Sequence, residues 1–359
     1  MLKPRETRLT RERRHDRHAS ASILTLARRR APTPSVVFDT YWRFAMERQE
    51  IFFRRLHNEV APWTDDPVLR EHKFTNVYRA SDRVSQYLIQ HVIYRREYSL
   101  RDTVLRTLLF KIFNKIETWE FLEEAFGEIT ESEFSVERLD ALLTHALEAG
   151  ASIYSAAYIM PSGPASIRQP RKHRMHLELL AELLRQGLPE RLAATASMAE
   201  VYSILVSLPS FGPFLAYQFA IDLNYSPHFT QSEMEFVMPG PGARDGLRKC
   251  FISFGDYSES DVIRWVAERQ EQEFVARGLM FKSLWGRALQ LIDCQNLFCE
   301  VDKYARVVHP DVMGHTGRMR IKQRFVCRGP APRPWFPPKW GLNDRIPESH
   351  HWARDALGR

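Results

Sequence analysis

Two short loops rich in glycine and proline, each followed by a helical stretch, are the strongest constraint on how the second half of this chain folds. The first runs from Leu208 to Phe214 and the second from Met238 to Arg244, about one helix apart. A helix that begins at such a loop presents unpaired backbone N–H groups and the positive end of its dipole, which can hold a phosphate. The pair therefore predicts a clamp on a nucleic-acid backbone, although ordinary turns between packed helices remain the alternative.

Apolar residues recur at helical spacing along most of the chain, and alternating segments typical of strands are scarce, which predicts an all-α fold. After Gly314, prolines and aromatic residues interleave, a pattern typical of an extended segment anchored by its rings. We expect an Arg-rich mobile arm (1–34), a helical domain (35–345) with a hairpin region (196–254), and a tail (346–359). The expected helices lie near 41–60, 76–96, 102–125, 136–149, 151–160, 174–187, 196–207, 213–223, 243–252, 260–276 and 283–298, with a short strand near 321–327.

The positive charge of the chain is concentrated in two segments. Residues 1–34 and residues 301–345 each carry ten Lys and Arg against three Asp and Glu, whereas residues 35–300 are acidic on balance. Basic segments of this kind suit a polyanion such as DNA, although merely solvated ends would look the same. No apolar run reaches the roughly 18 residues that a membrane helix needs. The 359 residues include four cysteines, which suits a reducing compartment, so we expect a cytoplasmic protein without membrane contact.

The first loop, with an apolar helix on each side, resembles the helix-hairpin-helix element of DNA repair glycosylases. In that element glycines let the backbone approach a DNA phosphate, and here Gly212 is present while Ser210 replaces the first glycine. The resemblance implies a catalytic carboxylate farther along the chain, for which Glu233, 21 residues after Gly212, is the match and Glu235 the alternate. Phe214 occupies the position of the lysine found in bifunctional members, which implies a monofunctional enzyme.

A carboxylate at Glu233 has a clear chemical use in such an enzyme. It can stabilise an oxocarbenium-like sugar or activate water as the base leaves. The alternative is that Glu233 caps a helix or faces solvent.

In the second loop, Gly240, Gly242 and Arg244 favour phosphate contact rather than a dinucleotide fingerprint, because no strand precedes them.

The expected helix over 76–96 carries a polar face. Asn76, Arg79 and Arg83 share it, and Asp82 can pair with either arginine. Arginines braced by an acid suit a phosphate or the edge of a base, although a solvated helix face is the default alternative.

A second set of polar residues opens the basic C-terminal region. Asp302 and Arg306 are one helical turn apart, and Lys303 and Tyr304 suit contact with a backbone or stacking on a base. Asp302 and Asp82 are alternative catalytic carboxylates. The spacing of cysteine and histidine predicts no metal site, and we expect no cofactor.

Four segments together resemble one family. Residues 74–87, 240–243, 302–306 and 337–341 are similar to the helical domain of 5-hydroxymethyl-deoxyuridine DNA kinases, which also occurs in α-glutamyl/putrescinyl thymine pyrophosphorylases. The resemblance covers residues 35–345 and implies a helix-hairpin-helix glycosylase-like fold that acts on modified bases in phage DNA. Stand-alone relatives resemble bacterial anti-phage glycosylases that excise a glucosylated hydroxymethylcytosine. The sequence lacks a G-x-x-x-x-G-K-[ST] loop, which argues against kinase activity.

We therefore expect a DNA glycosylase-like enzyme that flips out a hydroxymethylated or glucosylated pyrimidine and hydrolyses its N-glycosidic bond, in anti-phage defence. Glu233 would supply the carboxylate, and Asn76, Arg79 and Arg83 would line the base pocket. One alternative is a transferase that displaces pyrophosphate from an activated 5-hydroxymethyluracil to make a hypermodified thymine. The other is a DNA-binding module without catalysis. The modified base and the oligomeric state stay open.

Overall fold

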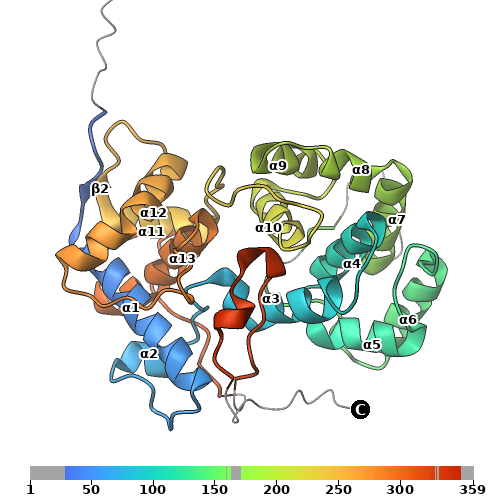
Figure 1. Ribbon diagram of the computed structural model, residues 1–359, viewed down its shortest axis with the longest axis horizontal. Coiled ribbons are helices and arrows are strands. Elements are labelled where there is room, and N and C mark those ends of the chain that lie inside the picture. The colour runs from blue at the N-terminus through green and yellow to red at the C-terminus, as the bar shows by residue number, and fades with distance from the viewer. Residues whose placement is uncertain (1–28, 159, 163–170, 328, 330, 349–359) are drawn as a thin grey trace, which may run out of the picture.

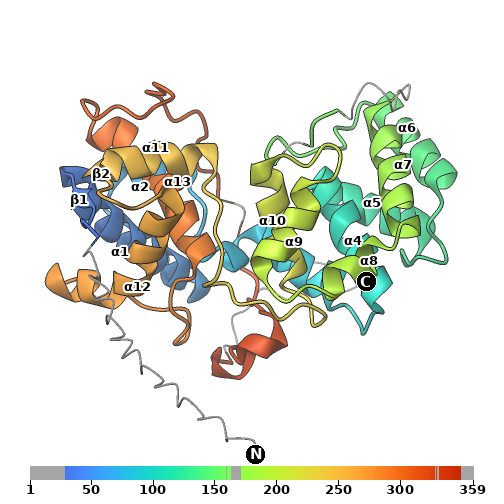
Figure 2. The ribbon, with the colours of Figure 1, turned by 90° about the horizontal axis from the view of Figure 1, so that it is seen from above.

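The computed structural model describes residues 29–158, 160–162, 171–327, 329 and 331–348. Within these residues, thirteen α-helices and one two-stranded antiparallel sheet form two lobes, which lie side by side in Figures 1 and 2. Residues from both ends of the described chain build one lobe, here called the terminal lobe. The middle of the chain builds the other, here called the central lobe. The predicted all-α class is confirmed.

The terminal lobe is organised around the crossing of two helices that come late in the chain. There α13 lies against α11 so closely that a Cβ on Gly246 would overlap the backbone carbonyl of Phe298. Helix α1 covers both helices with a buried aromatic face that includes Phe38, Tyr41 and Trp42. The elements of this lobe are α1 (Val36–Leu56), α2 (Pro67–Glu71), α11 (Pro241–Cys250), α12 (Glu259–Ala276), α13 (Leu291–Val308), β1 (Thr33–Pro34) and β2 (Phe251–Ser253).

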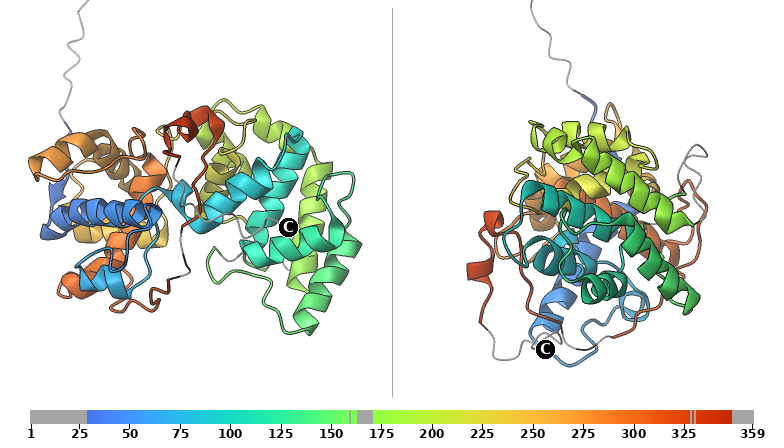
Figure 3. Two further views of the ribbon diagram at one scale, coloured as in Figure 1. Left: turned by 60° about the horizontal axis from the view of Figure 1, so that its bottom comes forward. Right: turned by 90° about the vertical axis from the view of Figure 1, so that its right-hand side faces the viewer.

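The central lobe is packed around α4, whose residues from Thr103 to Phe113 are all buried. Figure 3 shows α4 (cyan) among the green helices of this lobe. A helix that is buried on every side needs apolar residues all round or partners for its polar ones; α4 has apolar residues on all sides, and its buried Arg106 and Lys111 are paired. The helices of this lobe are α4 (Leu100–Phe113), α5 (Ile116–Phe126), α6 (Val136–Glu148), α7 (Lys172–Arg185), α8 (Leu188–Ala193), α9 (Met198–Val206) and α10 (Pro213–Leu223).

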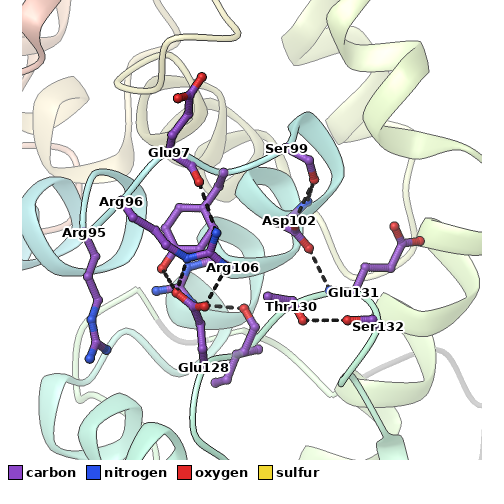
Figure 4. A network of polar contacts seen from close by, with 12 residues as sticks. Arg95, Arg96, Glu97, Ser99, Asp102, Arg106, Glu128, Thr130, Glu131 and Ser132 are labelled. Carbon is purple, nitrogen blue, oxygen red and sulfur yellow. Dashed lines mark hydrogen bonds and ion pairs between the residues drawn. The ribbon is translucent and has the colours of Figure 1, made fainter.

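A polar network fixes the loop after α5 against α4 (Figure 4). Arg106 is fully buried and donates hydrogen bonds to the carbonyls of Val92 and Ile129 at 2.8 and 2.9 Å. Asp102, in the first turn of α4, accepts the backbone N–H of Glu131 at 2.8 Å. Buried arginine is tolerated here because its N–H groups have partners.

The chain crosses from the terminal to the central lobe through a broken helix, so the continuous helix expected over 76–96 was wrong. Asp82 has an extended backbone (φ −69°, ψ 145°), and its carboxylate accepts the N–H of Asn76 at 2.8 Å. The segment consists of the 3₁₀ turn η1 (Arg79–Ser81), α3 (Arg83–Tyr87) and the π-helix η2 (Leu88–Ile93). The chain returns through residues 224–240. A C-terminal segment with η3 (Pro338–Trp340) and η4 (Asn343–Arg345), red in Figure 1, lies at the junction of the lobes.

Four other expectations differ from the structure. The single helix expected over 102–125 is two helices, α4 and α5, because the chain turns at Asn114, which has a φ of +48°. The described part of 151–160 holds no helix, and the helix expected at 283–298 begins instead at Leu291. In place of a strand at 321–327, a single bridge pairs Arg324 with His72. Residues 29–34 lie along the terminal lobe, where Arg30 pairs with Asp256 at 2.9 Å, and residues 1–28 of the expected arm lie outside the described residues.

Among the residues that the structure describes, no helix is long and apolar enough to cross a membrane. Across the same residues, no group of three or more His, Cys, Asp or Glu side chains is arranged to hold a metal ion. The four cysteines are all free thiols.

Candidate functional site

The first glycine loop joins α9 and α10, as the hairpin pattern predicted. Ser210 has a φ of +70°, in the left-handed region that favours glycine, at the position where the resemblance expects a glycine. Gly212 caps α10 without a side-chain hydrogen bond, is exposed, and would leave a Cβ in open space. The first turn of α10 is therefore open to a ligand from solvent.

The second glycine loop meets the first one. Gly240 begins α11, and a Cβ at this position would lie 2.6 Å from the ring of Phe214 in the first turn of α10. Tyr158 stacks on the same ring, with centroids 5.7 Å apart. The two helix starts are thus neighbours, one from each lobe, but Gly240 is buried against Phe214, so of the two glycines only Gly212 is exposed.

Gly242 and Arg244 have different surroundings. A Cβ on Gly242 would overlap the Cys299 sulfur, so this glycine allows α11 and α13 to cross. Arg244 is exposed and pairs with Glu259 at 3.1 Å, on the first turn of α12. Of the two, Arg244 is accessible to an anion and Gly242 serves packing.

Glu233 lies buried on the returning segment, at the junction of the lobes. Its carboxylate is 2.7 Å from an Nη atom of Arg287, in the loop before α13. The Arg287 guanidinium stacks on the ring of Trp340, 3.7 Å from the centroid. Next to Trp340, the Lys339 ammonium donates to the carbonyls of Asn224, Ser226 and Phe229. The C-terminal segment thereby holds the Glu233 ion pair in place.

Asp293 is a second buried carboxyl near Glu233. Burial raises the pKa of Asp293 to about 7, and the negative charge of Glu233 adds to the shift. Its two oxygens accept the backbone N–H groups of Arg79 and Gln290, at 2.9 and 3.0 Å. Asp293 therefore fixes the start of α13 against η1, which positions the neighbouring Arg287 loop.

Arg79 connects the two lobes through buried polar contacts. Its guanidinium makes a bidentate pair with Asp222 on α10, at 2.6 and 3.0 Å, and also bonds to Gln218 and the Tyr225 hydroxyl. Lys111 on α4 approaches the same carboxylate at 3.1 Å. The expected contact of Arg79 with a base has to compete with these bonds. Tyr225 also packs edge-to-face on Trp340, which connects this network to the Glu233 pair.

The polar face expected over Asn76, Arg79 and Arg83 does not form, because the three side chains point to different partners. Asn76 accepts a bond from Arg48 at 2.6 Å and donates to the carbonyl of Ser81. Arg83 is exposed, 3.7 Å from Glu117. Burial raises the pKa of Asp82 to about 6.

The predicted C-terminal set lies within the terminal lobe. Asp302 is buried between Lys249, at 2.9 Å, and Arg306. Lys303 pairs with Glu300 at 2.6 Å, and the Tyr304 hydroxyl donates to Asp66. Asp302, Asp82 and Glu233 thus have separate partners, and Glu233 is the one beside the C-terminal segment.

Arg287 and Asp293 had not been predicted. Gln290 and Asp293 have the spacing of a capping box, a signal that marks a helix start, and that start lies at the true beginning of α13. Arg287 had no such signal, because its partner Glu233 is 54 residues away.

Comparison with known proteins agrees with the resemblance seen in the sequence. The model of a family described as the 5-hmdU DNA kinase helical domain matches residues 35–314. A 5-hmdU DNA kinase of Bacillus phage SP10 is 28% identical over 296 residues, which cover 77% of this chain. They cover 46% of that relative, so the chain spans about half its length. No solved structure matches significantly. Because the family model covers well over half of the chain, the protein belongs to the family of the 5-hmdU DNA kinase helical domain.

Proposed function

We propose that this protein binds DNA that carries a hydroxymethylated or glucosylated pyrimidine and cleaves the N-glycosidic bond of that base. Family membership supports the substrate class, because the phage relative is described as a kinase of 5-hmdU in DNA. The exposed helix start at Gly212, which lies next to the start of α11, supports DNA as the partner, since such a helix start favours phosphate. Arg244, exposed on the first turns of α11, adds positive charge there.

The observation that carries the catalytic assignment is the buried Glu233–Arg287 ion pair beneath Trp340. In the proposed reaction a water molecule forms a bond to C1′ of the sugar as the C1′–N bond breaks. The proton of the water passes to Glu233, and the base leaves with the bonding electrons and takes up a proton. Arg287 keeps the carboxylate oriented, and Trp340 supports Arg287 through its ring.

The test compares DNAs that carry 5-hydroxymethyluracil, glucosylated hydroxymethylcytosine or unmodified bases. Abasic sites are detected by alkaline cleavage and released bases by mass spectrometry. We expect excision from one modified DNA and a loss of about a hundredfold or more in Glu233→Gln, with DNA binding retained. Glu271→Gln is the control, because Glu271 is exposed on α12 away from this site, and Glu235→Gln tests the alternate carboxylate.

Other outcomes contradict the proposal in different ways. Full activity of Glu233→Gln would remove this residue from the mechanism. Intact strands with an altered base mass would replace excision by the transferase reaction. DNA binding with unchanged bases on every substrate would leave a binding module without catalysis.

A further inference from the structure

A cavity of about 300 Å³ lies inside the terminal lobe, apart from the residues assigned to DNA chemistry above. Its walls come from α1, residues 61–64, α2, and Phe325 of the C-terminal region. Phe325 is held there because its N–H donates to the Glu71 carbonyl at 2.9 Å, and Lys73 donates to the Gln323 carbonyl at 3.0 Å. These backbone hydrogen bonds hold the C-terminal region against the other walls of the cavity. The cavity is called the arginine pocket below.

The charges that line the arginine pocket are all basic. Arg48, Arg55, Arg70 and His72 contribute to the wall, and the wall contains no carboxylate among the described residues. Two acids of adjacent segments already have partners: Glu47 accepts the Thr64 hydroxyl, and Asp66 accepts N–H groups of α2 and the Tyr304 hydroxyl. The pocket thus concentrates positive charge without a counterion from its own wall.

Arg48 carries the clearest sign of a missing partner. The residue is 8% exposed, and one of its Nη atoms donates to Asn76 at 2.6 Å. The other Nη atom is buried and has no hydrogen-bond partner in the described structure, and the same holds for Nδ1 of His72. A buried donor without a partner costs free energy, which an anion in the cavity would recover. Burial lowers the pKa of Arg48 to about 10; the charges of Asp82 and Glu300 oppose this shift, and nearby Arg55 adds to it.

The rest of the wall is aromatic and apolar. Trp63 and Phe325 meet edge to face, with centroids 6.2 Å apart, and the Arg55 guanidinium lies over both rings at 5.2 and 5.8 Å. Phe74 also lines the cavity. Rings and guanidinium planes of this kind stack on nucleobases.

We propose that the arginine pocket binds one nucleotide unit, with its base against the aromatic wall and its phosphate on the arginines. The volume is at the lower end of the range of about 300–1,000 Å³ for small-molecule sites, which suits one nucleotide rather than a dinucleotide. A free nucleoside monophosphate and a single extrahelical nucleotide of a DNA strand present the same chemistry. This site is separate from Glu233 and does not depend on the excision reaction.

Isothermal titration calorimetry on the full chain tests the site with dTMP, thymidine, inorganic phosphate and a short single-stranded oligonucleotide. We expect dTMP or the oligonucleotide to bind, and Arg55→Gln and Trp63→Leu each to weaken that binding by about tenfold or more. Arg185→Gln is the matched control, because Arg185 is 73% exposed on α7 of the central lobe. Arg70→Gln, at an exposed lining position, provides a third variant if Trp63→Leu fails to fold.

Every outcome of this titration bears on the proposal. Binding of dTMP that the pocket variants weaken supports a site for free nucleotides, and binding of the oligonucleotide alone that these variants weaken supports a site for a nucleotide of the strand. The proposal is overturned if neither dTMP nor the oligonucleotide binds, or if the pocket variants bind them with the affinity of the wild type. Phosphate that binds as tightly as dTMP also overturns it, because the aromatic wall then contributes nothing. Glu233→Gln should bind as the wild type does, so failure here is distinguishable from failure of the excision reaction.

Discussion

Arg79 and Arg48 are both buried arginines, one at the junction of the lobes and one in the arginine pocket, but their surroundings differ. Arg79 has Asp222, Gln218 and Tyr225 as partners, and Lys111 shares the same carboxylate. Arg48 has one strong bond, to Asn76, and an Nη atom without a partner. A buried cation with a complete set of partners serves the fold, whereas one with an unused donor is available to a ligand.

The largest expected effect on stability comes from removing the carboxylate that pairs with Arg79. Asp222→Ala leaves two buried cations, Arg79 and Lys111, without their counterion. We expect the free energy of unfolding to fall by about 3–5 kcal/mol in urea denaturation. Glu117→Ala, which breaks the exposed pair with Arg83, should change it by less than about 1 kcal/mol. Equal losses in the two variants would mean that the junction does not depend on this network.

Asp82, a carboxyl near Arg48, should make the stability of the protein depend on pH. Asp82 lies near Arg48 and Glu300, and burial raises its pKa to about 6 from an ordinary 3.8. The folded state therefore binds this proton more tightly than the unfolded state. Its stabilising contribution is complete below pH 3.8 and is lost as the pH rises through 6.

Asp82→Asn removes that titration. The difference in unfolding free energy, wild type minus Asp82→Asn, should fall by about 2 kcal/mol between pH 4 and pH 7. Urea denaturation at several pH values measures it. A difference in unfolding free energy that does not change with pH would mean that the pKa of Asp82 is not raised in the folded protein.

The smallest expected effect is at Arg48 itself. Arg48→Met removes a charge that is only partly satisfied, so the free energy of unfolding should change by less than about 1 kcal/mol. Arg79→Met, by contrast, should cost about 3 kcal/mol, because it breaks a bidentate buried pair. Similar losses of unfolding free energy in the two variants would contradict the distinction between an arginine that serves the fold and one that is available to a ligand.

Much of the fold could be predicted from local patterns. The spacing of apolar residues located α6 and α10 within one residue of their observed bounds, and the glycine loop between α9 and α10 indicated a hairpin. The helix at 283–298 was misplaced, because Leu284 and Leu289 are buried in a loop rather than on a helix. Apolar spacing over a short segment does not distinguish these two cases.

Less of the candidate site could be predicted, since its contacts join residues far apart in the sequence. Glu233 was chosen from its distance to the hairpin, and its partner Arg287 had no local signal. Arg79 was assigned to a base pocket because arginines at helical spacing look alike in a sequence. The broken backbone at Asp82 instead directs Arg79 inward to Asp222.

The terminal lobe also has a consequence for how the protein is made on the ribosome. Tyr41 of α1 donates to the carbonyl of Cys294, 253 residues later, while the whole central lobe lies between them in the sequence. The central lobe can therefore assemble during synthesis, but the aromatic face of α1 has to wait for α11 and α13. A ribosome that stalls before α13 releases a chain in which Tyr41 lacks both the Phe298 ring and the Cys294 carbonyl, and such a fragment is a substrate for chaperones or proteases.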